Sequence, residues 1–161
     1  MCGNKEALLS KYEQLIRFAS WQNIPIISTY EHPVEKKGTM PASLVELLPH
    51  NHQNFLKHTF SCYKEALIRK ALQSYKQVAV VGAETDVCVL QTVQDLLSND
   101  IEVYLLEDCL FSTEKNVQPA IKRMYDAGAI PTTYKILFYE LLETVKNLQL
   151  PEQLIFPEDL K

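Results

Sequence analysis

Short apolar segments alternate with amphipathic segments along most of the chain, and this alternation constrains the fold more than any other feature. The clearest apolar segment is Gln77-Val-Ala-Val-Val-Gly82, which leads through a short turn into a helical pattern from Asp86 to Leu97. Buried parallel strands are continuous apolar runs of this kind. Strands that alternate with helices pack as a parallel sheet with helices on both faces. The sequence therefore predicts an α/β fold, a three-layer α/β/α arrangement with a mainly parallel, Rossmann-like sheet.

The other elements follow the same pattern. Further helices are predicted over residues 5–22, 41–48, 61–75, 115–127 and 134–145. Further strands are predicted over residues 24–30, 101–106 and 130–133, and residues 31–40 and 50–59 are predicted to be loops. Ligands of open α/β sheets bind outside the carboxyl ends of the strands. This rule directs the search for a functional site to residues 30–40, 82–88 and 107–113.

Length and composition narrow the class of protein. The 161 residues match one ordinary domain, so we expect residues 1–161 to form a single domain. Sixteen Lys and Arg against twenty Asp and Glu give a net charge of −4, which disfavours nucleic acid as a partner. No apolar run of about 18 residues is present, so we expect no membrane partner. The first residues lack the apolar stretch of a signal peptide, and we expect a cytoplasmic protein.

The four cysteines, at positions 2, 62, 88 and 109, are not spaced for metal binding or for a disulfide scaffold. We therefore expect a reducing compartment, no metal and no cofactor. Cys88 stands apart because it falls in the first turn of the helix that follows the clearest strand. Free backbone N–H groups and the helix dipole favour a thiolate there. From this placement alone, a nucleophile and a small apolar packing residue are equally good interpretations.

Four stretches, in order along the chain, resemble the isochorismatase-like cysteine hydrolases, and the small isochorismatase-domain proteins in particular. Residues 80–97, VVGAETDVCVLQTVQDLL, are similar to the family's strand, turn and nucleophile-bearing helix. Residues 24–31 are similar to the family's second strand, and Lys57-His-Thr-Phe-Ser61 to its K-x-x-F-S motif. Residues 106–112 and 124–128 resemble its strand–D-x-x-x-S–helix–G segment. The metal-binding D-x-H and downstream His of nicotinamidases are absent from this pattern, which disfavours that activity.

The resemblance implies a mechanism. It makes Cys88 the nucleophile and Lys57 the catalytic cation that lowers the thiol pKa. It also implies a cis peptide between Ala83 and Glu84, with the N–H groups of Glu84 and Cys88 forming an oxyanion hole. The implied reaction is hydrolysis of a small amide or related C–N compound through a thioester intermediate. The resemblance further implies a homo-oligomer and a small-molecule substrate.

One expected residue is absent. The family that this chain resembles carries an Asp at the end of a first strand, ahead of the first helix, whereas this chain has no Asp before Asp86. Three interpretations stay open: the sequence is part of a longer chain that supplies this strand, the protein is naturally short and inactive, or another carboxylate substitutes. Glu31, at the end of the second family strand, is the candidate substitute. The first interpretation is favoured, because loss of a central strand leaves two unpaired sheet edges.

Several other residues are candidates for the pocket wall or for support of the catalytic residues. They are Tyr30, Glu31, Phe60, Ala83, Thr85 and Asp108. Two functions compete with the hydrolase. The first is a catalytically inactive family member that acts as an oligomeric interaction protein. The second, a nucleotide-binding domain, is weaker because the chain has no phosphate-binding glycine motif.

Overall fold

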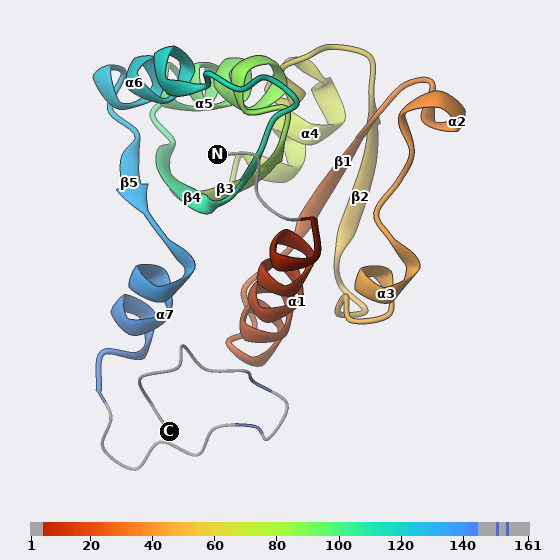
Figure 1. Cartoon of the computed structure of the whole chain (residues 1–161), viewed down its shortest axis with the longest axis vertical. Coiled ribbons are helices and arrows are strands. Elements are labelled where there is room, and N and C mark those ends of the chain that lie inside the picture. Colours follow the sequence, from red (N-terminus) through yellow and green to blue (C-terminus); the bar gives the residue numbers. More distant parts are fainter. Residues whose placement is uncertain (1–4, 145–150, 152–153, 155–161) are drawn as a thin grey trace.

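The computed structural model describes residues 5–144, 151 and 154 (Figure 1). The described helices are α1 Lys5–Trp21, α2 Val34–Lys37, α3 Ala42–Val45, α4 Ala66–Leu72, α5 Leu90–Leu97, α6 Gln118–Asp126 and α7 Tyr134–Leu142. A 3₁₀ turn, η1 Cys62–Lys64, precedes α4, and a π-helical turn, η2 Thr85–Val89, precedes α5. The described strands are β1 Ile27–Glu31, β2 Gln53–Lys57, β3 Gln77–Ala83, β4 Glu102–Phe111 and β5 Ile130–Thr132.

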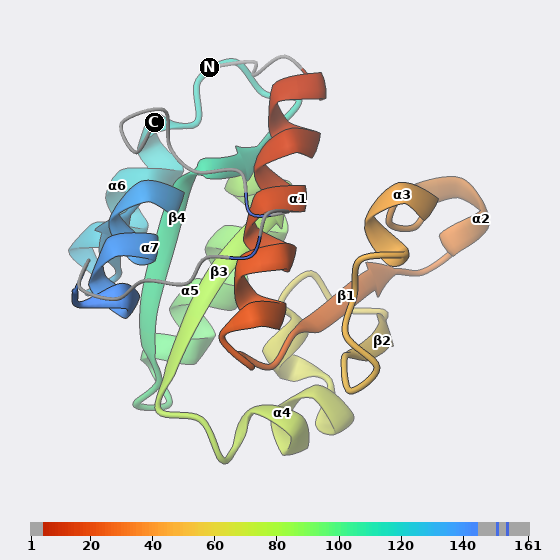
Figure 2. The same ribbon diagram turned by 90° about the horizontal axis from the view of Figure 1, so that it is seen from below.

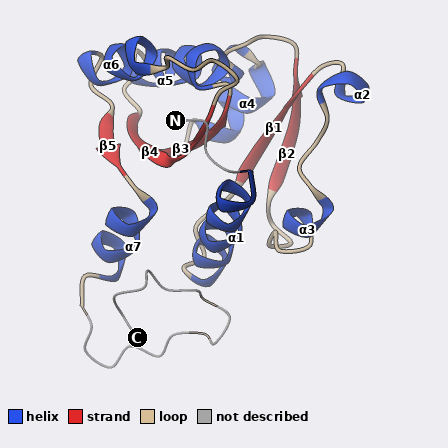
Figure 3. Ribbon diagram, viewed as in Figure 1, coloured by secondary structure: helices blue, strands red, loops and turns tan. Residues whose placement is uncertain are grey.

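All strand pairs in the described part of the chain are parallel, and they form two sheets. One sheet has the order β3-β4-β5, and the other consists of β1 and β2. Within the described residues, β1 and β3 are not paired, so each has one edge without a neighbouring strand. Helices lie on both sides of the larger sheet (Figure 3). The predicted α/β class with three α/β/α layers is therefore confirmed.

The central strand β4 supplies the core on both faces. Val103 and Leu105 belong to a buried cluster with α4, α5 and α6, and Leu106 and Cys109 belong to a second cluster with α1 and α7. All four side chains are fully buried. Figure 2 shows α1 and α5 on opposite sides of β3 and β4. The apolar run of residues 103–106 within β4 thus follows from burial on both faces.

The segment over residues 50–59 is wrongly predicted as a loop. Residues Gln53–Lys57 form β2, which pairs with β1 in parallel register. The sequence QNFLK contains no β-branched residue and has no clear alternation. Pairing with β1, a tertiary interaction, stabilises this strand, and local propensity does not reveal it.

The predicted helix over residues 61–75 is interrupted. Glu65 has extended backbone angles, with ψ 125°, and separates η1 from α4. Its carboxylate accepts hydrogen bonds from the backbone N–H groups of His58 and Thr59. These bonds stabilise the extended conformation at a position where the apolar pattern alone predicts a continuous helix.

The strand predicted over residues 101–106 is longer than expected. β4 continues to Phe111, so residues 107–109 lie within the strand and not in a loop after it. The register with β3 shifts between Val80 and Gly82, and pairing then resumes with Gly82 opposite Leu110. The two strands then end together, because Ala83 pairs with Phe111. The last predicted helix, over residues 134–145, is shorter than expected: α7 ends at Leu142, and Glu143 after it has a left-handed conformation with φ 56°, while residue 145 itself lies outside the described residues.

Candidate active site

Two paired strands end with oppositely charged residues. Glu31 is the last residue of β1, Lys57 is the last residue of β2, and the two are direct partners in the parallel register. Neighbouring partners in a sheet project to the same face. The pairing of β1 with β2 therefore places a carboxylate beside an ammonium group at the carboxyl edge of this sheet, where ligands bind in open α/β folds.

The cysteine comes from the turn after β3. Gly82 has φ 117°, a conformation that glycine adopts without steric cost, and the Ala83–Glu84 peptide bond is cis. The buried Thr85 hydroxyl donates a hydrogen bond of 2.8 Å to the carbonyl of the last residue of β4. This bond ties the turn to the larger sheet. Cys88 follows within η2, so it lies at the start of the helical segment, as the sequence predicts.

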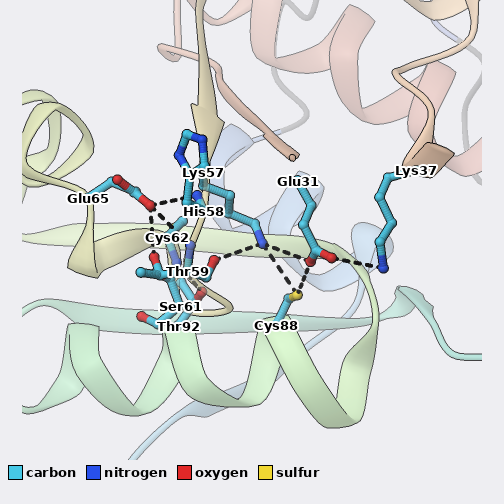
Figure 4. A network of polar contacts seen from close by, with 10 residues as sticks. All are labelled: Glu31, Lys37, Lys57, His58, Thr59, Ser61, Cys62, Glu65, Cys88 and Thr92. Carbon is cyan, nitrogen blue, oxygen red and sulfur yellow. Dashed lines mark hydrogen bonds and ion pairs between the residues drawn. The ribbon is translucent and has the colours of Figure 1, made fainter. Parts of the chain in front are cut away.

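Glu31, Lys57 and Cys88 converge on one point (Figure 4). The Cys88 thiol donates to Glu31 Oε2 at 3.3 Å. Lys57 Nζ lies 3.3 Å from the same oxygen and 3.4 Å from Cys88 Sγ. The carboxylate, the ammonium and the thiol therefore form a closed triangle of contacts, although they come from three different elements.

Lys57 is buried, with 5% of its surface exposed. A buried ammonium must have hydrogen-bond acceptors, and Lys57 Nζ also donates to the Thr59 carbonyl at 3.1 Å. Glu65 holds the turn that provides this carbonyl, since it accepts from the N–H groups of His58 and Thr59 and from the Thr59 hydroxyl. These bonds, the one from the His58 N–H above all, lower the pKa of the Glu65 carboxyl. Glu65 thus fixes the position of the buried lysine.

Glu31 is strongly stabilised as a carboxylate. Its pKa is lowered from 4.5 to about 2, first by the hydrogen bond from Lys37, then by those from Cys88 and Lys57. Lys37 Nζ lies 2.9 Å from Glu31 Oε1, the oxygen that does not face the thiol. At neutral pH the site therefore holds an ionised carboxylate, which accepts the hydrogen bond of the Cys88 thiol.

The thiol of Cys88 is not acidified. Burial raises its pKa most, and the hydrogen bond to Glu31 raises it further, while Lys57 acts in the opposite direction. Lys57 lowers the Cys88 pKa, as the resemblance implies, but burial and the hydrogen bond to Glu31 raise it by more. The negative charge of Glu31 beside the sulfur, together with burial, outweighs the nearby ammonium, and the protonated thiol donates to the carboxylate.

The side chain of Glu84 lies apart from the triangle. Glu84 Oε2 accepts from the Ser112 hydroxyl at 2.9 Å and from the Thr113 N–H at 2.6 Å. These bonds attach the residue to the segment that follows β4. The oxyanion-hole role expected of Glu84 concerns its backbone N–H. This N–H belongs to the same turn as Cys88.

The other candidate residues differ in how near they lie to the triangle and in how exposed they are. Tyr30 is half-buried on β1 beside Glu31, and Ala83 is exposed at the turn before Cys88. Phe60, which follows the turn after β2, has 54% of its surface exposed. Asp108 lies apart from the triangle: it accepts from the first N–H of α7 at 2.9 Å and pairs with a lysine of α1 at 3.3 Å. It fastens two helices to β4.

Two residues of this network, Lys37 and Glu65, are not among the candidates that the sequence indicates. Lys37 lies six residues after Glu31, behind Pro33, and Glu65 lies eight residues after Lys57. Both are charged residues in segments next to candidate catalytic residues. Only that proximity in the chain could have indicated them, because lysines and glutamates are common on protein surfaces.

Residues 5–144, 151 and 154 contain no group of three or more His, Cys, Asp or Glu arranged to hold a metal ion. Among the helices that the structure describes, none is long and apolar enough to cross a membrane.

The fold and the site define a class of protein: an α/β protein with a cysteine at the start of the helical segment after a parallel strand, in contact with a buried lysine and a carboxylate. The isochorismatase domain model matches residues 2–135. The chain is 30% identical over 143 residues to isochorismatase family protein 1A of Dictyostelium discoideum, covering 86% of this chain and 68% of that protein. The chain belongs to the isochorismatase family, and this membership supports a hydrolase-type function.

Other relatives agree with this assignment. The chain is 31% identical to isochorismatase family protein 1B of the same organism over 82% of its own length and 66% of that protein's. It thus spans about two thirds of the length of these curated relatives. It is 27% identical to isochorismatase domain-containing protein 2B of Mus musculus, over 90% of this chain and 68% of that protein.

Solved structures show the same fold. A structure named MAR1 ribonuclease, from Caenorhabditis elegans, has a TM-score of 0.82 and 28% identity, covering 94% of this chain and 84% of that one. YcaC from Escherichia coli, described as an octameric hydrolase of unknown specificity, has a TM-score of 0.84 over 90% of this chain and 72% of that one. At 20% identity, YcaC supports the fold alone.

Proposed function

We propose that this protein is a cysteine hydrolase that acts on a small amide or related C–N compound through a thioester intermediate. The triangle of Glu31, Lys57 and Cys88 carries this proposal, since a nucleophile needs a base within hydrogen-bond reach and the base needs an orienting group. Glu31 accepts the thiol hydrogen bond at 3.3 Å, and Lys57 contacts both partners. Glu31 thereby takes the place of the Asp that the family carries on another strand.

The reaction follows from these contacts. Glu31 takes the Cys88 proton as the sulfur attacks the substrate carbon, and Lys57 stabilises the negative charge that the sulfur and the carboxylate share. The N–H groups of Glu84 and Cys88 hold the oxyanion. Protonated Glu31 then gives its proton to the departing amine, which leaves a thioester. Glu31 finally removes a proton from a water molecule that hydrolyses the thioester, and the thiol is restored.

We further propose that the protein works in the cytoplasm as a homo-oligomer on a small-molecule substrate, without metal or cofactor. Resemblance to the family implies the homo-oligomer, and YcaC from Escherichia coli, which shares the fold, is described as an octamer. Light scattering coupled to size-exclusion chromatography tests it: a mass above one chain is expected, and a mass of one chain at micromolar concentration contradicts it.

One observation favours a second function, in which the protein is a catalytically inactive family member and acts as an interaction protein. Within the described residues, the facing edges of β1 and β3 lack a paired strand, and unpaired edges are templates for association with another chain. The sequence also left open that a longer chain supplies a further strand next to these edges, and this stays a prediction. If the interaction function holds, Cys88→Ala leaves assembly unchanged and no amide substrate is hydrolysed.

The first test is the pH dependence of iodoacetamide alkylation at Cys88, read by mass spectrometry. We expect an apparent pKa above the roughly 8.5 of a free thiol. Glu31→Gln is expected to lower this pKa by about one unit, because it removes the negative charge beside the sulfur. Lys57→Ala is expected to raise it by about one unit, because it removes the cation.

The controls use the same chain. Glu35→Gln, an exposed carboxylate on α2, removes the same charge and should leave the Cys88 titration unchanged. Cys62, whose pKa is raised mainly by burial, reports on the general state of the fold in Glu31→Gln and Glu35→Gln; in Lys57→Ala its pKa also loses the lowering effect of the Lys57 charge. A Cys88 titration that responds to neither Glu31→Gln nor Lys57→Ala contradicts the catalytic triangle. If it responds, ammonia release from a panel of small amides, absent in Cys88→Ser, tests the hydrolase itself.

A further inference from the structure

The two oxygens of Glu31 have separate partners. Oε2 faces inward, 3.3 Å from both Cys88 Sγ and Lys57 Nζ. Oε1 faces Lys37 Nζ at 2.9 Å. Figure 4 shows Lys37 and Lys57 on opposite sides of the carboxylate. The carboxylate is therefore held between two cations, and only the inner cation also contacts the sulfur.

The two lysines differ in their surroundings. The Lys57 side chain is 6% exposed, whereas the Lys37 side chain is 55% exposed. Lys37 is the last residue of α2, a helix without buried residues that lies between Pro33 and Gly38. Lys37 thus reaches Glu31 from the solvent side, on a short helix that the core does not hold.

We propose that Lys37 is a positioning residue, which holds Glu31 with Oε2 directed at the Cys88 thiol and opposes protonation of the carboxylate in the substrate-free protein. A carboxylate can rotate about its last side-chain bond, and a partner on one oxygen restricts that rotation. Lys37 is hydrogen-bonded to Glu31 and interacts with Cys88 only through charge, so its positioning role acts through Glu31. This inference rests on the proposed function, because it gives Lys37 a role only if Glu31 serves Cys88.

The charges around Glu31 determine in which direction its pKa should change when Lys37 is removed. Lys37 faces it from α2, Lys57 from β2 and Cys88 from η2, and the hydrogen bond from Lys37 is the largest cause of the lowered Glu31 pKa. Glu84, on the turn before η2, interacts with Lys37 as a second carboxylate. Removal of Lys37 leaves one cation against the Glu31 charge, so the carboxyl should bind a proton more readily.

The direct test is a carbon NMR titration of glutamate side chains between pH 3 and 6, in which Glu31→Gln identifies the Glu31 signal. In the wild type, the Glu31 signal should remain that of a carboxylate down to about pH 3, because its pKa is about 2. In Lys37→Gln, the midpoint should rise by about one to two pH units. Lys37→Arg retains a cation and should keep the low midpoint.

Lys36→Gln is the matched control, since Lys36 is the neighbouring exposed lysine of α2 and no shift of the Glu31 pKa arises from it. It should titrate like the wild type. A Lys37→Gln midpoint equal to that of the wild type overturns the inference. So does an equal rise in Lys36→Gln, because a general loss of positive charge then explains the effect.

The alkylation experiment separates the two proposals. Lys37→Gln should raise the Cys88 pKa in the same direction as Lys57→Ala and by a smaller amount, because Lys37 is more exposed. If wild-type Cys88 depends on Glu31 but Lys37→Gln changes neither titration, the positioning role fails and the proposed function stands. If Cys88 does not depend on Glu31 at all, the proposed function fails, and with it the role of Lys37.

Discussion

At the scale of single residues, the chemistry of this protein depends on one glutamate. Glu31 lies 57 positions from Cys88 in the sequence, yet its Oε2 is the hydrogen-bond acceptor of the thiol. The contact pairs a carboxylate of lowered pKa with a thiol of raised pKa. Protons of groups in such close contact belong to the pair. Proton transfer within the pair, under the influence of Lys57, is therefore the property to measure.

The same residue makes the stability dependent on pH. The folded-state pKa of Glu31 is about 2 and its ordinary value is 4.5, so the carboxylate stabilises the fold above pH 4.5. This contribution should be lost as the pH falls from 4.5 towards 2. Glu31→Gln should therefore be less stable than the wild type at pH 7, and the difference should shrink at pH 3. Urea unfolding at both values measures it, and a difference independent of pH contradicts the ion-pair explanation.

At the scale of elements, local pattern and tertiary contact decide different features. The helix over 5–22 and the strand over 77–82 are found close to their predicted places, because each has a strong periodic or apolar signal. The strand β2 is missed, because pairing with β1 and not its own composition stabilises it. The break at Glu65 is missed for a related reason: its carboxylate binds backbone groups of another segment.

The start of α7 offers a prediction at this scale. Thr133 is the N-cap of α7, and its hydroxyl accepts a hydrogen bond from the Ile136 N–H at 3.3 Å. Thr133→Ala leaves that N–H without its side-chain partner and should lower the free energy of unfolding by about 1 kcal/mol. Thr133→Ser keeps the hydroxyl and should cost much less. Urea denaturation of the wild type and the two variants measures these free energies. Equal losses of unfolding free energy in both variants would exclude the N-cap hydrogen bond as the cause.

At the scale of the whole molecule, β4 joins the two buried clusters. Leu105 faces the cluster with α4, α5 and α6, and Leu106 faces the cluster with α1 and α7. The strand also pairs with β3 on one side and β5 on the other. A change on either face of β4 should therefore destabilise both layers of helices together.

The test compares identical substitutions at buried and exposed leucines. Leu105→Ala and Leu106→Ala each remove a fully buried side chain and should cost about 2–5 kcal/mol of unfolding free energy. Leu67→Ala, on α4, removes a side chain that is 70% exposed and should change it by less than about 0.5 kcal/mol. Circular dichroism at helix and aromatic wavelengths should show one shared transition in every variant. Two separate transitions would show that β4 does not couple the layers.

The sequence by itself determined the α/β class and the strand–turn–helix around Cys88. Through family resemblance it also indicated Lys57 as a candidate catalytic residue. These features depend on residues that are contiguous in the chain, so periodicity and motif spacing express them. Only the tertiary structure decided that Glu31 faces Cys88, that Lys37 faces Glu31, and that burial and Glu31 raise the pKa of the thiol. Contacts between separate elements depend on strand pairing, on the shift of register in β4 and on burial. The sequence pattern of any one segment does not contain them.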